Sequence, residues 1–233
     1  MQFVLLAGGL GTRLRGTIPD GVPKPMAPVA GRPFLERLLD VAVDGGADEV
    51  VLLVGHRSSA ISEHFGSAYR GLPVQYVVED APLGTGGAVR QAVDILADHF
   101  ILLNGDSYAE VDFGVLASHL DEGPLAMTLT PVSDAGRFGT VAVEHDRAVR
   151  LIGKGVRGPS LINAGIYACA RDLVQPLPLG RPSSFEVDVL ETRVPVLRPR
   201  FELTTSAFFD IGVPEDYARA NEYFTARDLH DGR

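Results

Sequence analysis

The segment Leu6-Ala7-Gly8-Gly9-Leu10-Gly11-Thr12-Arg13-Leu14 follows directly on the short apolar run Phe3-Val4-Leu5. Its glycines at positions 8, 9 and 11 permit positive φ angles and leave the backbone N–H groups uncovered by side chains. In α/β proteins, such a turn at the carboxyl end of a strand binds phosphate oxygens through main-chain donors. Arg13 adds a planar guanidinium that suits a polyphosphate. The segment therefore predicts a buried strand that ends in a phosphate-binding turn, with an ordinary tight turn as the alternative.

A lysine follows on the same N-terminal arm, in Pro23-Lys24-Pro25, between two residues whose rings fix φ. The dinucleotide-binding fingerprint is excluded, because Leu14 occupies the position of its third glycine. A P-loop is excluded as well, since no Gly-Lys-Ser/Thr follows at the required spacing. A flexible anion-binding turn and a rigidly held cation together predict a site for a nucleoside triphosphate.

Apolar runs alternate with helical spacing along the first half of the chain. Strands are expected at 3–6, 50–54, 74–78 and 100–103, with amphipathic helices beginning at Pro33 and carrying Val89. This order predicts a mostly parallel, doubly wound sheet. The second half is less regular. Strands are expected at 126–131, 139–143, 148–152, 162–168 and 207–211, and a final helix is expected to begin at Pro214.

Length and composition indicate an ordinary globular protein of 233 residues, long enough for one large core. The formal charge of −9 argues against nucleic acid or an anionic membrane as the main partner. We expect no signal peptide and no membrane span, and therefore a cytoplasmic protein. The single cysteine, Cys169, lies in an apolar run and is predicted to be a buried core thiol.

Two aspartates end predicted strands far apart in the sequence. Asp106 closes the fourth strand in Asn104-Gly105-Asp106, and Asp210 stands in Phe208-Phe209-Asp210-Ile211-Gly212. A lone aspartate in such a turn is more often a cap. Magnesium, however, takes hard oxygen ligands and needs only one or two carboxylates when phosphates and water complete its shell.

The glycine-rich turn and the Pro23-Lys24-Pro25 segment together resemble the signature of the sugar-1-phosphate nucleotidylyltransferases, and the resemblance runs from Met1 to about Phe224. It implies an α/β, Rossmann-like three-layer nucleotidyltransferase fold, with a mostly parallel central sheet and a smaller sugar-binding β subregion. It also implies one domain over 1–233, divided into a nucleotide-binding half (about 1–110) and a sugar-phosphate-binding half (about 111–233). The implied reaction transfers a nucleoside monophosphate from a nucleoside triphosphate to a sugar 1-phosphate, with Mg²⁺ as cofactor, and releases pyrophosphate.

The resemblance assigns roles to particular residues. The catalytic residues are expected to be Arg13, Lys24 and Asp106, and the Mg²⁺ ligands Asp106 and Asp210. The expected nucleotide-binding residues are Leu6, Ala7, Gly8, Gly9, Gly11, Thr12, Arg13, Glu79, Pro82, Gly84 and Thr85. The expected sugar-phosphate-binding residues are Asn104, Gly139, Lys154, Asn163, Gly165 and Glu186. Gly153 replaces the glutamate that usually precedes the family's lysine, so that sugar contact is missing or made elsewhere.

Glu79 predicts which nucleotide base is bound. A carboxylate can accept hydrogen bonds from both N1–H and the exocyclic amine of guanine, but it finds only one donor on uracil or thymine. This favours GTP. Softer motifs at 23–28, 31–36 and 184–188 resemble the D-glycero-D-manno-heptose 1-phosphate guanylyltransferase branch. Mannose-1-phosphate guanylyltransferases and N-acetylmuramate-1-phosphate uridylyltransferases remain alternatives. The sequence leaves the oligomeric state open, and a homodimer is compatible with it.

The alternative from a different functional class is a non-catalytic paralogue that binds nucleotide sugars and regulates a partner. Such a protein is expected to lose Lys24, Asp106 or Asp210, and all three are present. The sequence therefore favours an enzyme.

Overall fold

The computed structural model describes residues 1–9, 14, 16–19, 21–55, 58–204 and 207–230. Within these ranges, none of the helices has the length and apolar character that crossing a membrane requires. The strands of the main sheet are, in chain order, β1 (Gln2–Leu6), β4 (Glu49–Val54), β5 (Ala68–Tyr69), β6 (Leu72–Val78), β7 (His99–Asn104), β9 (Leu125–Val132), β10 (Thr140–Glu144), β11 (Arg147–Ile152), β12 (Ser160–Ala170) and β13 (Arg200–Leu203).

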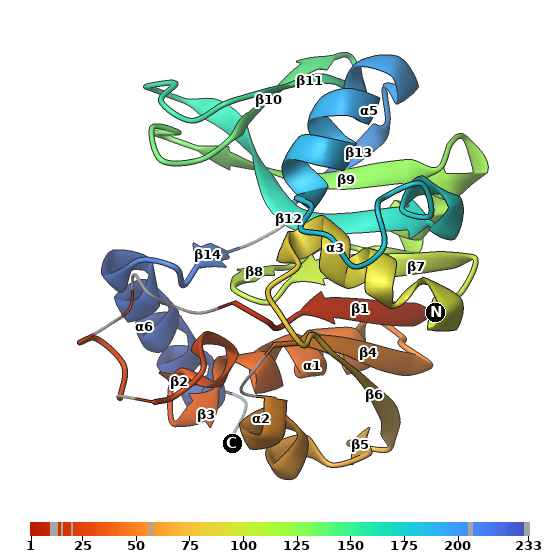
Figure 1. Ribbon diagram of the computed structural model, residues 1–233. Coiled ribbons are helices and arrows are strands. Elements are labelled where there is room, and N and C mark those ends of the chain that lie inside the picture. Colours follow the sequence, from red (N-terminus) through yellow and green to blue (C-terminus); the bar gives the residue numbers. More distant parts are fainter. Residues whose placement is uncertain (10–13, 15, 20, 56–57, 205–206, 231–233) are drawn as a thin grey trace.

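In the part of the chain that the structure describes, these ten strands form one sheet in the order β10-β11-β13-β9-β12-β7-β1-β4-β6-β5 (Figure 1). The pairs β7–β1, β1–β4 and β4–β6 are parallel, as the alternation of strands and helices predicts. Beyond β7 the sheet changes character, because β12 runs antiparallel to both β7 and β9. Two small antiparallel pairs lie outside it: β2 (Pro28–Val29) with β3 (Arg32–Pro33), and β8 (Ser107–Ala109) with β14 (Phe208–Asp210).

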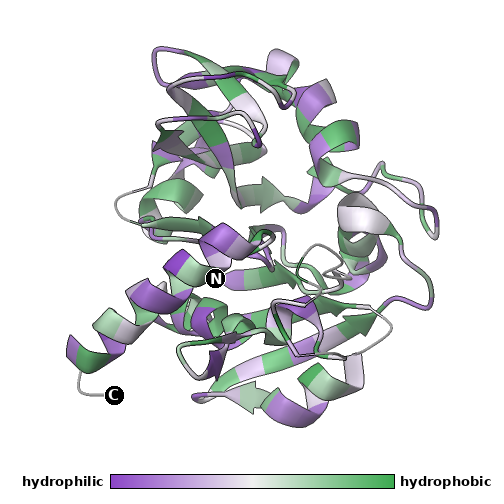
Figure 2. Ribbon diagram, turned by 90° about the vertical axis from the view of Figure 1, so that its left-hand side faces the viewer, coloured by the Kyte–Doolittle hydropathy of each residue, from purple (hydrophilic) through white to green (hydrophobic). Residues whose placement is uncertain are grey.

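The helices cover both faces of the sheet. They are α1 (Phe34–Asp44), α2 (Ser58–Phe65), α3 (Gly84–Gln91), α4 (Phe113–Ser118), a π-helix (Phe185–Leu190), α5 (Glu191–Leu197) and α6 (Pro214–His230). Short 3₁₀ turns occur at Lys24–Met26, Val93–Ile95, His119–Asp121 and Arg171–Leu173. Figure 2 shows apolar residues concentrated along the strands, whereas hydrophilic residues recur along the helices.

Two hydrophobic cores lie on opposite faces of the sheet, because successive side chains of a strand alternate between the faces. Phe3 and Leu5 belong to the core that also holds residues of α1, α2, α4 and α6. Val4, between them, belongs to the core that holds residues of α3, α5 and the π-helix. Cys169 is fully buried in this second core, as predicted. The arrangement confirms the three-layer α/β fold.

Some predicted elements have different limits in the structure. The helix that carries Val89 ends at Gln91, and its apolar spacing continues as the 3₁₀ turn Val93–Ile95. The strand expected at 207–211 spans only Phe208–Asp210. Strand β13 and helix α5 have no counterpart among the predictions.

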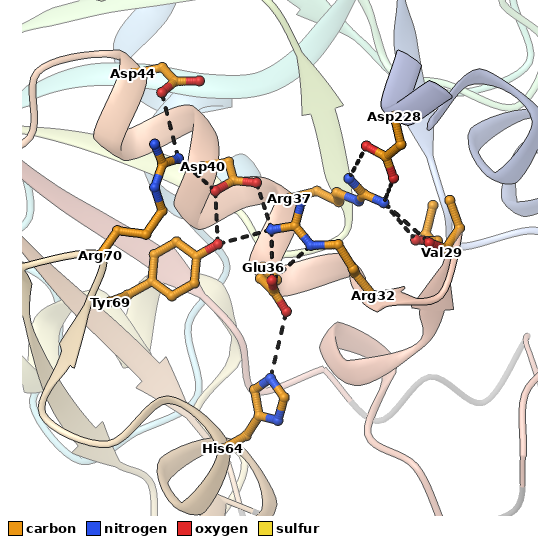
Figure 3. A network of polar contacts seen from close by, with 11 residues as sticks. Val29, Arg32, Glu36, Arg37, Asp40, Asp44, His64, Tyr69, Arg70 and Asp228 are labelled. Atoms are coloured by element: carbon orange, nitrogen blue, oxygen red, sulfur yellow. Dashed lines mark hydrogen bonds and ion pairs between the residues drawn. The ribbon is translucent and has the colours of Figure 1, made fainter. Parts of the chain in front are cut away.

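The last helix, α6, is fastened to the β2–β3 hairpin that follows Lys24. Asn221 Oδ1 accepts a hydrogen bond from the Ala30 N–H at 2.9 Å. The guanidinium of Arg37, buried on α1, donates to both carboxylate oxygens of Asp228 at 2.8 and 2.6 Å (Figure 3). Ala30 adopts a φ of 49°, which is unfavourable for a residue with a Cβ. The contacts from α6 thus stabilise a hairpin turn that is locally strained.

A second polar group joins α1 to the short edge strand β5 (Figure 3). Arg32 donates to Glu36 at 2.7 Å and to Asp40 at 2.8 Å, while the Tyr69 hydroxyl donates to Asp40 at 2.8 Å. Burial acts to raise the pKa of Asp40, but hydrogen bonds from Tyr69, Arg32 and Arg70 outweigh it and lower that pKa. Asp40 therefore stays ionised at neutral pH and holds three elements together.

Candidate active site

A pocket of about 340 Å³ opens at the carboxyl ends of the parallel strands. Leu6 ends β1 and Asn104 ends β7, while Glu79 directly follows β6. Because the strands are parallel, these three ends meet at one edge of the sheet, where open α/β sheets bind ligands. The lining residues are Leu6, Gly8, Gly9, Lys24, Pro25, Leu53, Glu79, Pro82, Gly84, Thr85, Ala88, Asn104, Gly105, Asp106 and Glu186.

Glycine is required where these strand ends approach each other. A Cβ on Gly105 would lie 2.2 Å from the carbonyl oxygen of Leu6, and the Gly105 N–H donates to that oxygen at 3.1 Å. A Cβ on Gly8 would lie 3.2 Å from Glu79 Oε2 and 3.3 Å from the Gly55 nitrogen. The absence of side chains at these positions lets main-chain atoms of three strands form the floor of the pocket.

Lys24 and Asp106 form an ion pair at the mouth of the pocket. The Lys24 Nζ lies 2.5 Å from Asp106 Oδ2, and Lys24 is only 7% exposed. The 3₁₀ turn at Lys24–Met26 aims this side chain at the end of β7. A cation held so near to a carboxylate, with little access to water, is well placed to neutralise charge on a bound phosphate.

Asp210 lies next to this ion pair because β14 pairs with β8. In that pairing Asp210 is opposite Ser107, and the Ile211 N–H donates to the Asp106 carbonyl at 2.9 Å. A Cβ on Gly212 would be 2.7 Å from Asp210 Oδ1 and 3.0 Å from Lys24 Nζ. The structure therefore brings both predicted carboxylates and the lysine to one place, although they are far apart in the sequence.

The donor set at this place suits magnesium. Carboxylates from two neighbouring strands supply hard oxygen ligands, and Mg²⁺ commonly takes one or two carboxylates beside substrate phosphates. Among the residues that the structure describes, no group of three or more His, Cys, Asp or Glu side chains gathers as a metal site. A magnesium ion at Asp106 and Asp210 would thus rely on phosphate and water for its remaining ligands.

Glu79 presents a buried carboxylate to the opposite side of the pocket. It is 8% exposed, and its Oε1 accepts a hydrogen bond from the Leu83 N–H at 3.3 Å. Burial raises the pKa of Glu79, and this hydrogen bond opposes the rise only in part. Ionisation of Glu79 is therefore unfavourable in the free protein, and a ligand that donates hydrogen bonds to the carboxylate would stabilise the ionised form.

We expect Glu79→Gln to raise the melting temperature of the ligand-free protein at pH 7 to 8. Since the folded-state pKa is raised, ionisation of Glu79 disfavours the folded state, and stability falls as pH rises from the ordinary glutamate value of about 4.3 through the folded-state pKa. Glutamine removes this penalty and keeps an acceptor for the Leu83 N–H. The gain should disappear below about pH 4, where glutamate is neutral in both states. Thermal melts of both proteins between pH 3.5 and 8 measure it, and an equal gain at every pH would contradict it.

Thr85 and Glu186 meet on the third side of the pocket. The Thr85 hydroxyl donates to Glu186 Oε2 at 2.9 Å and accepts from the Phe185 N–H at 2.8 Å. Glu186 lies in the first turn of the π-helix, whose N-cap residue is Ser184. These contacts bring the first turn of α3 together with the segment that follows the proline-rich loop.

The other residues predicted from the sequence lie as follows. Ala7 is buried and does not line the pocket. Gly165 packs against Asn104, since a Cβ there would be 2.5 Å from Asn104 Nδ2. The Asn163 N–H donates to the Gly139 carbonyl at 3.2 Å, so these two are neighbours, yet neither lines the pocket.

Two further groups of predicted residues stand apart. Lys154 is exposed on the turn between Gly153 and Gly155 and does not line the pocket. Gly11, Thr12 and Arg13 lie outside the described residues.

Four lining residues were not predicted: Pro25, Leu53, Gly105 and Ala88. Pro25 and Gly105 belong to motifs already identified in the sequence, so their position next to Lys24 and Asp106 could have predicted that they line the pocket. Leu53 and Ala88 are apolar residues of a strand and a helix, and nothing in the sequence distinguishes them from core residues.

Comparison with known proteins adds independent evidence. A family model described as nucleotidyl transferase matches residues 2–227. The D-glycero-alpha-D-manno-heptose 1-phosphate guanylyltransferase of Campylobacter jejuni is 37% identical over 218 residues, which are 93% of this chain and 97% of that protein. The enzyme of the same name from Aneurinibacillus thermoaerophilus is 33% identical, covering 95% of this chain and 97% of the relative. A mannose-1-phosphate guanylyltransferase of Mycobacterium tuberculosis is 34% identical over 95% of this chain and 64% of its own length.

Solved structures agree with these relatives. The crystal structure of HddC from Yersinia pseudotuberculosis has a TM-score of 0.83 and 33% identity, covering 96% of this chain and 99% of the other. HddC in complex with GMP-PN has a TM-score of 0.82. The match over residues 2–227 confirms the family that the turn at 8–14 and the Pro23-Lys24-Pro25 segment predict, and the chain belongs to the nucleotidyl transferase family.

Proposed function

We propose that this protein transfers GMP from GTP to D-glycero-α-D-manno-heptose 1-phosphate, releasing pyrophosphate. The proposal is supported chiefly by one observation, that the Lys24–Asp106 ion pair and the buried Glu79 carboxylate line the same pocket. The relatives named as heptose 1-phosphate guanylyltransferases, similar over nearly their whole length, support the sugar and the nucleotide.

The reaction needs positioning and charge neutralisation more than a base. An oxygen of the sugar 1-phosphate attacks the α-phosphorus in line, and pyrophosphate leaves. The attacking phosphate is already anionic, because the second pKa of a phosphate monoester is about 6. Lys24 would neutralise the α-phosphate as its charge grows, while the N–H groups of Gly8 and Gly9 would bind the neighbouring phosphates. We further propose that Arg13, with Gly11 and Thr12, binds the terminal phosphates.

We propose Asp106 and Asp210 as the ligands of Mg²⁺. When bound, the ion would neutralise charge on the reacting phosphates. Lys24 contributes here as well, because its ion pair with Asp106 fixes the direction of that carboxylate before substrate arrives.

The sugar phosphate would occupy the side of the pocket formed by Asn104 and Glu186. Gly165 keeps the backbone close to Asn104, and Glu186 can accept hydrogen bonds from sugar hydroxyls. Asn163 and Gly139, which are hydrogen-bonded to each other, would continue this side. We propose that Lys154 meets the phosphate of the sugar from its exposed turn.

The test is a matrix of GTP, ATP, UTP, CTP and dTTP against mannose, heptose, glucose and aminosugar 1-phosphates, read by Mg²⁺-dependent pyrophosphate release. The highest kcat/KM is expected for GTP with the heptose 1-phosphate. Equal or better turnover of mannose 1-phosphate would favour the function of the mycobacterial relative. No pyrophosphate from any pair, with nucleotide sugar still bound, would favour a non-catalytic binder.

Substitution of Glu79 tests the proposed specificity for guanine. We expect Glu79→Gln to lower kcat/KM for GTP by about 10- to 100-fold, since a hydrogen bond to a charged group contributes about 1.5–3 kcal/mol. The amide retains one acceptor but adds donors that face those of guanine. Activity with ATP or UTP should change far less. Asp80→Asn, an exposed neighbour, is the matched control. A clear preference of the unmodified enzyme for UTP or dTTP would remove Glu79 from base recognition.

A further inference from the structure

The first turn of α3 is joined to the segment before the π-helix so closely that no side chain fits between them. The N–H groups of Gly86 and Gly87 both donate to the Ser183 carbonyl, at 2.9 and 3.2 Å. The Ser183 N–H donates in turn to the Leu83 carbonyl at 2.8 Å. A Cβ on Gly84 would lie 2.6 Å from the Ser183 oxygen. Backbone hydrogen bonds therefore hold the two segments together, although one borders the proposed nucleotide site and the other leads to Glu186.

The Thr85 hydroxyl occupies the centre of this junction. It accepts from the Phe185 N–H and donates to Glu186 Oε2, so it contacts both the backbone and the carboxylate at the start of the π-helix. A second hydroxyl, that of Ser184, donates to the same Glu186 oxygen at 3.2 Å. Because a glutamate side chain has several free torsions, two donors on one oxygen restrict the direction of the other oxygen.

We propose that Thr85 is a positioning residue, which orients the Glu186 carboxylate toward the hydroxyl groups of the sugar and thereby couples the nucleotide side of the pocket to the sugar side. The inference rests on the proposed function, in which Glu186 binds the sugar. A preoriented carboxylate loses less conformational freedom when the sugar binds, and this lowers the cost of binding. Thr85 thus acts through Glu186, in place of direct readout of the base by its hydroxyl.

Thr85→Val tests this role, because valine keeps the shape and removes both hydrogen bonds of the hydroxyl. We expect the KM for the sugar 1-phosphate to rise about 10-fold or more, the effect of losing a hydrogen bond to a charged group. The KM for GTP should change by less than about threefold. Thr85→Ser, which keeps the hydroxyl, should restore the KM for the sugar phosphate.

The matched control is Thr192→Val. The Thr192 hydroxyl donates to the carbonyls of Asp188 and Val189 in the same helical segment, on an exposed side away from the pocket. This variant should leave both KM values unchanged, which separates the proposed role from a general effect on the π-helix.

A double-mutant cycle with Glu186→Gln completes the experiment. If Thr85 acts through Glu186, adding Thr85→Val to Glu186→Gln should cost much less than Thr85→Val alone. Additive losses, an unchanged KM for the sugar phosphate, or a rise confined to the KM for GTP would overturn the inference. Absence of pyrophosphate release by the unmodified enzyme would instead overturn the proposed function, so the two failures are distinguishable. Should Thr85→Val not fold, the cycle is run with Thr85→Ala.

Discussion

Lys24→Ala lowers kcat by about 10²-fold or more, the usual consequence of removing one preorganised donor from developing negative charge. Lys24 is only 7% exposed and its Nζ lies 2.5 Å from Asp106 Oδ2, so water cannot readily replace the ammonium group. The loss should fall mainly on kcat, because in the proposed mechanism Lys24 neutralises charge that grows in the transition state. Steady-state kinetics with both substrates at saturation, read by pyrophosphate release, measures the effect.

The control for this variant is Arg147→Ala, which removes the cation of another ion pair, with Glu122 at 2.5 Å on the surface of the molecule. It should retain the turnover of the unmodified enzyme. A thermal melt of Lys24→Ala distinguishes loss of chemistry from loss of folding, since the substitution leaves Asp106 without its cation. Unchanged kcat in a folded Lys24→Ala protein would exclude Lys24 from the mechanism.

Asp106→Asn and Asp210→Asn form the second prediction, with an expected loss of at least about 10²-fold in kcat for each. Asparagine keeps the shape of the side chain, but it replaces one of the two carboxylate oxygens by an amide nitrogen and removes the negative charge that would attract Mg²⁺. Each variant should also need a higher concentration of Mg²⁺ for half-maximal rate. Pyrophosphate release measured across a Mg²⁺ titration reports both quantities.

Asp98→Asn is the matched control, because Asp98 is a surface carboxylate paired with Arg171 at 2.5 Å. Its rate and its Mg²⁺ dependence should equal those of the unmodified enzyme. If either pocket variant kept both properties, that aspartate would not be a ligand of the ion. If only Asp106→Asn lost activity, Asp210 would serve the fold of the β14 turn alone.

Much of this site could be predicted from the sequence because the relevant side chains follow strands. Leu6, Glu79 and Asn104 each stand at or just after the end of an apolar run, and parallel strands bring such ends to one edge. The close approach of these strand ends also explains the glycines beside them, because a Cβ on Gly105 would overlap the Leu6 carbonyl oxygen.

The remaining features depend on tertiary contacts that no local pattern specifies. Arg200-Phe201-Glu202-Leu203 alternates polar and apolar side chains as a strand does, but four residues are too few to predict one, and β13 forms where β9 offers it a parallel partner. Helix α5 contains Pro195, which normally argues against a helix, but it continues a π-helix that is already formed. The contact of Thr85 with Glu186 joins residues 101 positions apart, so only the folded chain reveals it.

The fastening of the β2–β3 hairpin by α6 has a consequence for how the protein is made. Lys24 leaves the ribosome long before Asn221 and Asp228, which hold the hairpin through Ala30 and Arg37. The parallel strands can already pair while the lysine arm still lacks its anchor. We therefore expect a nascent chain that stops short of α6 to hold the lysine arm loosely, even where its parallel strands have already paired.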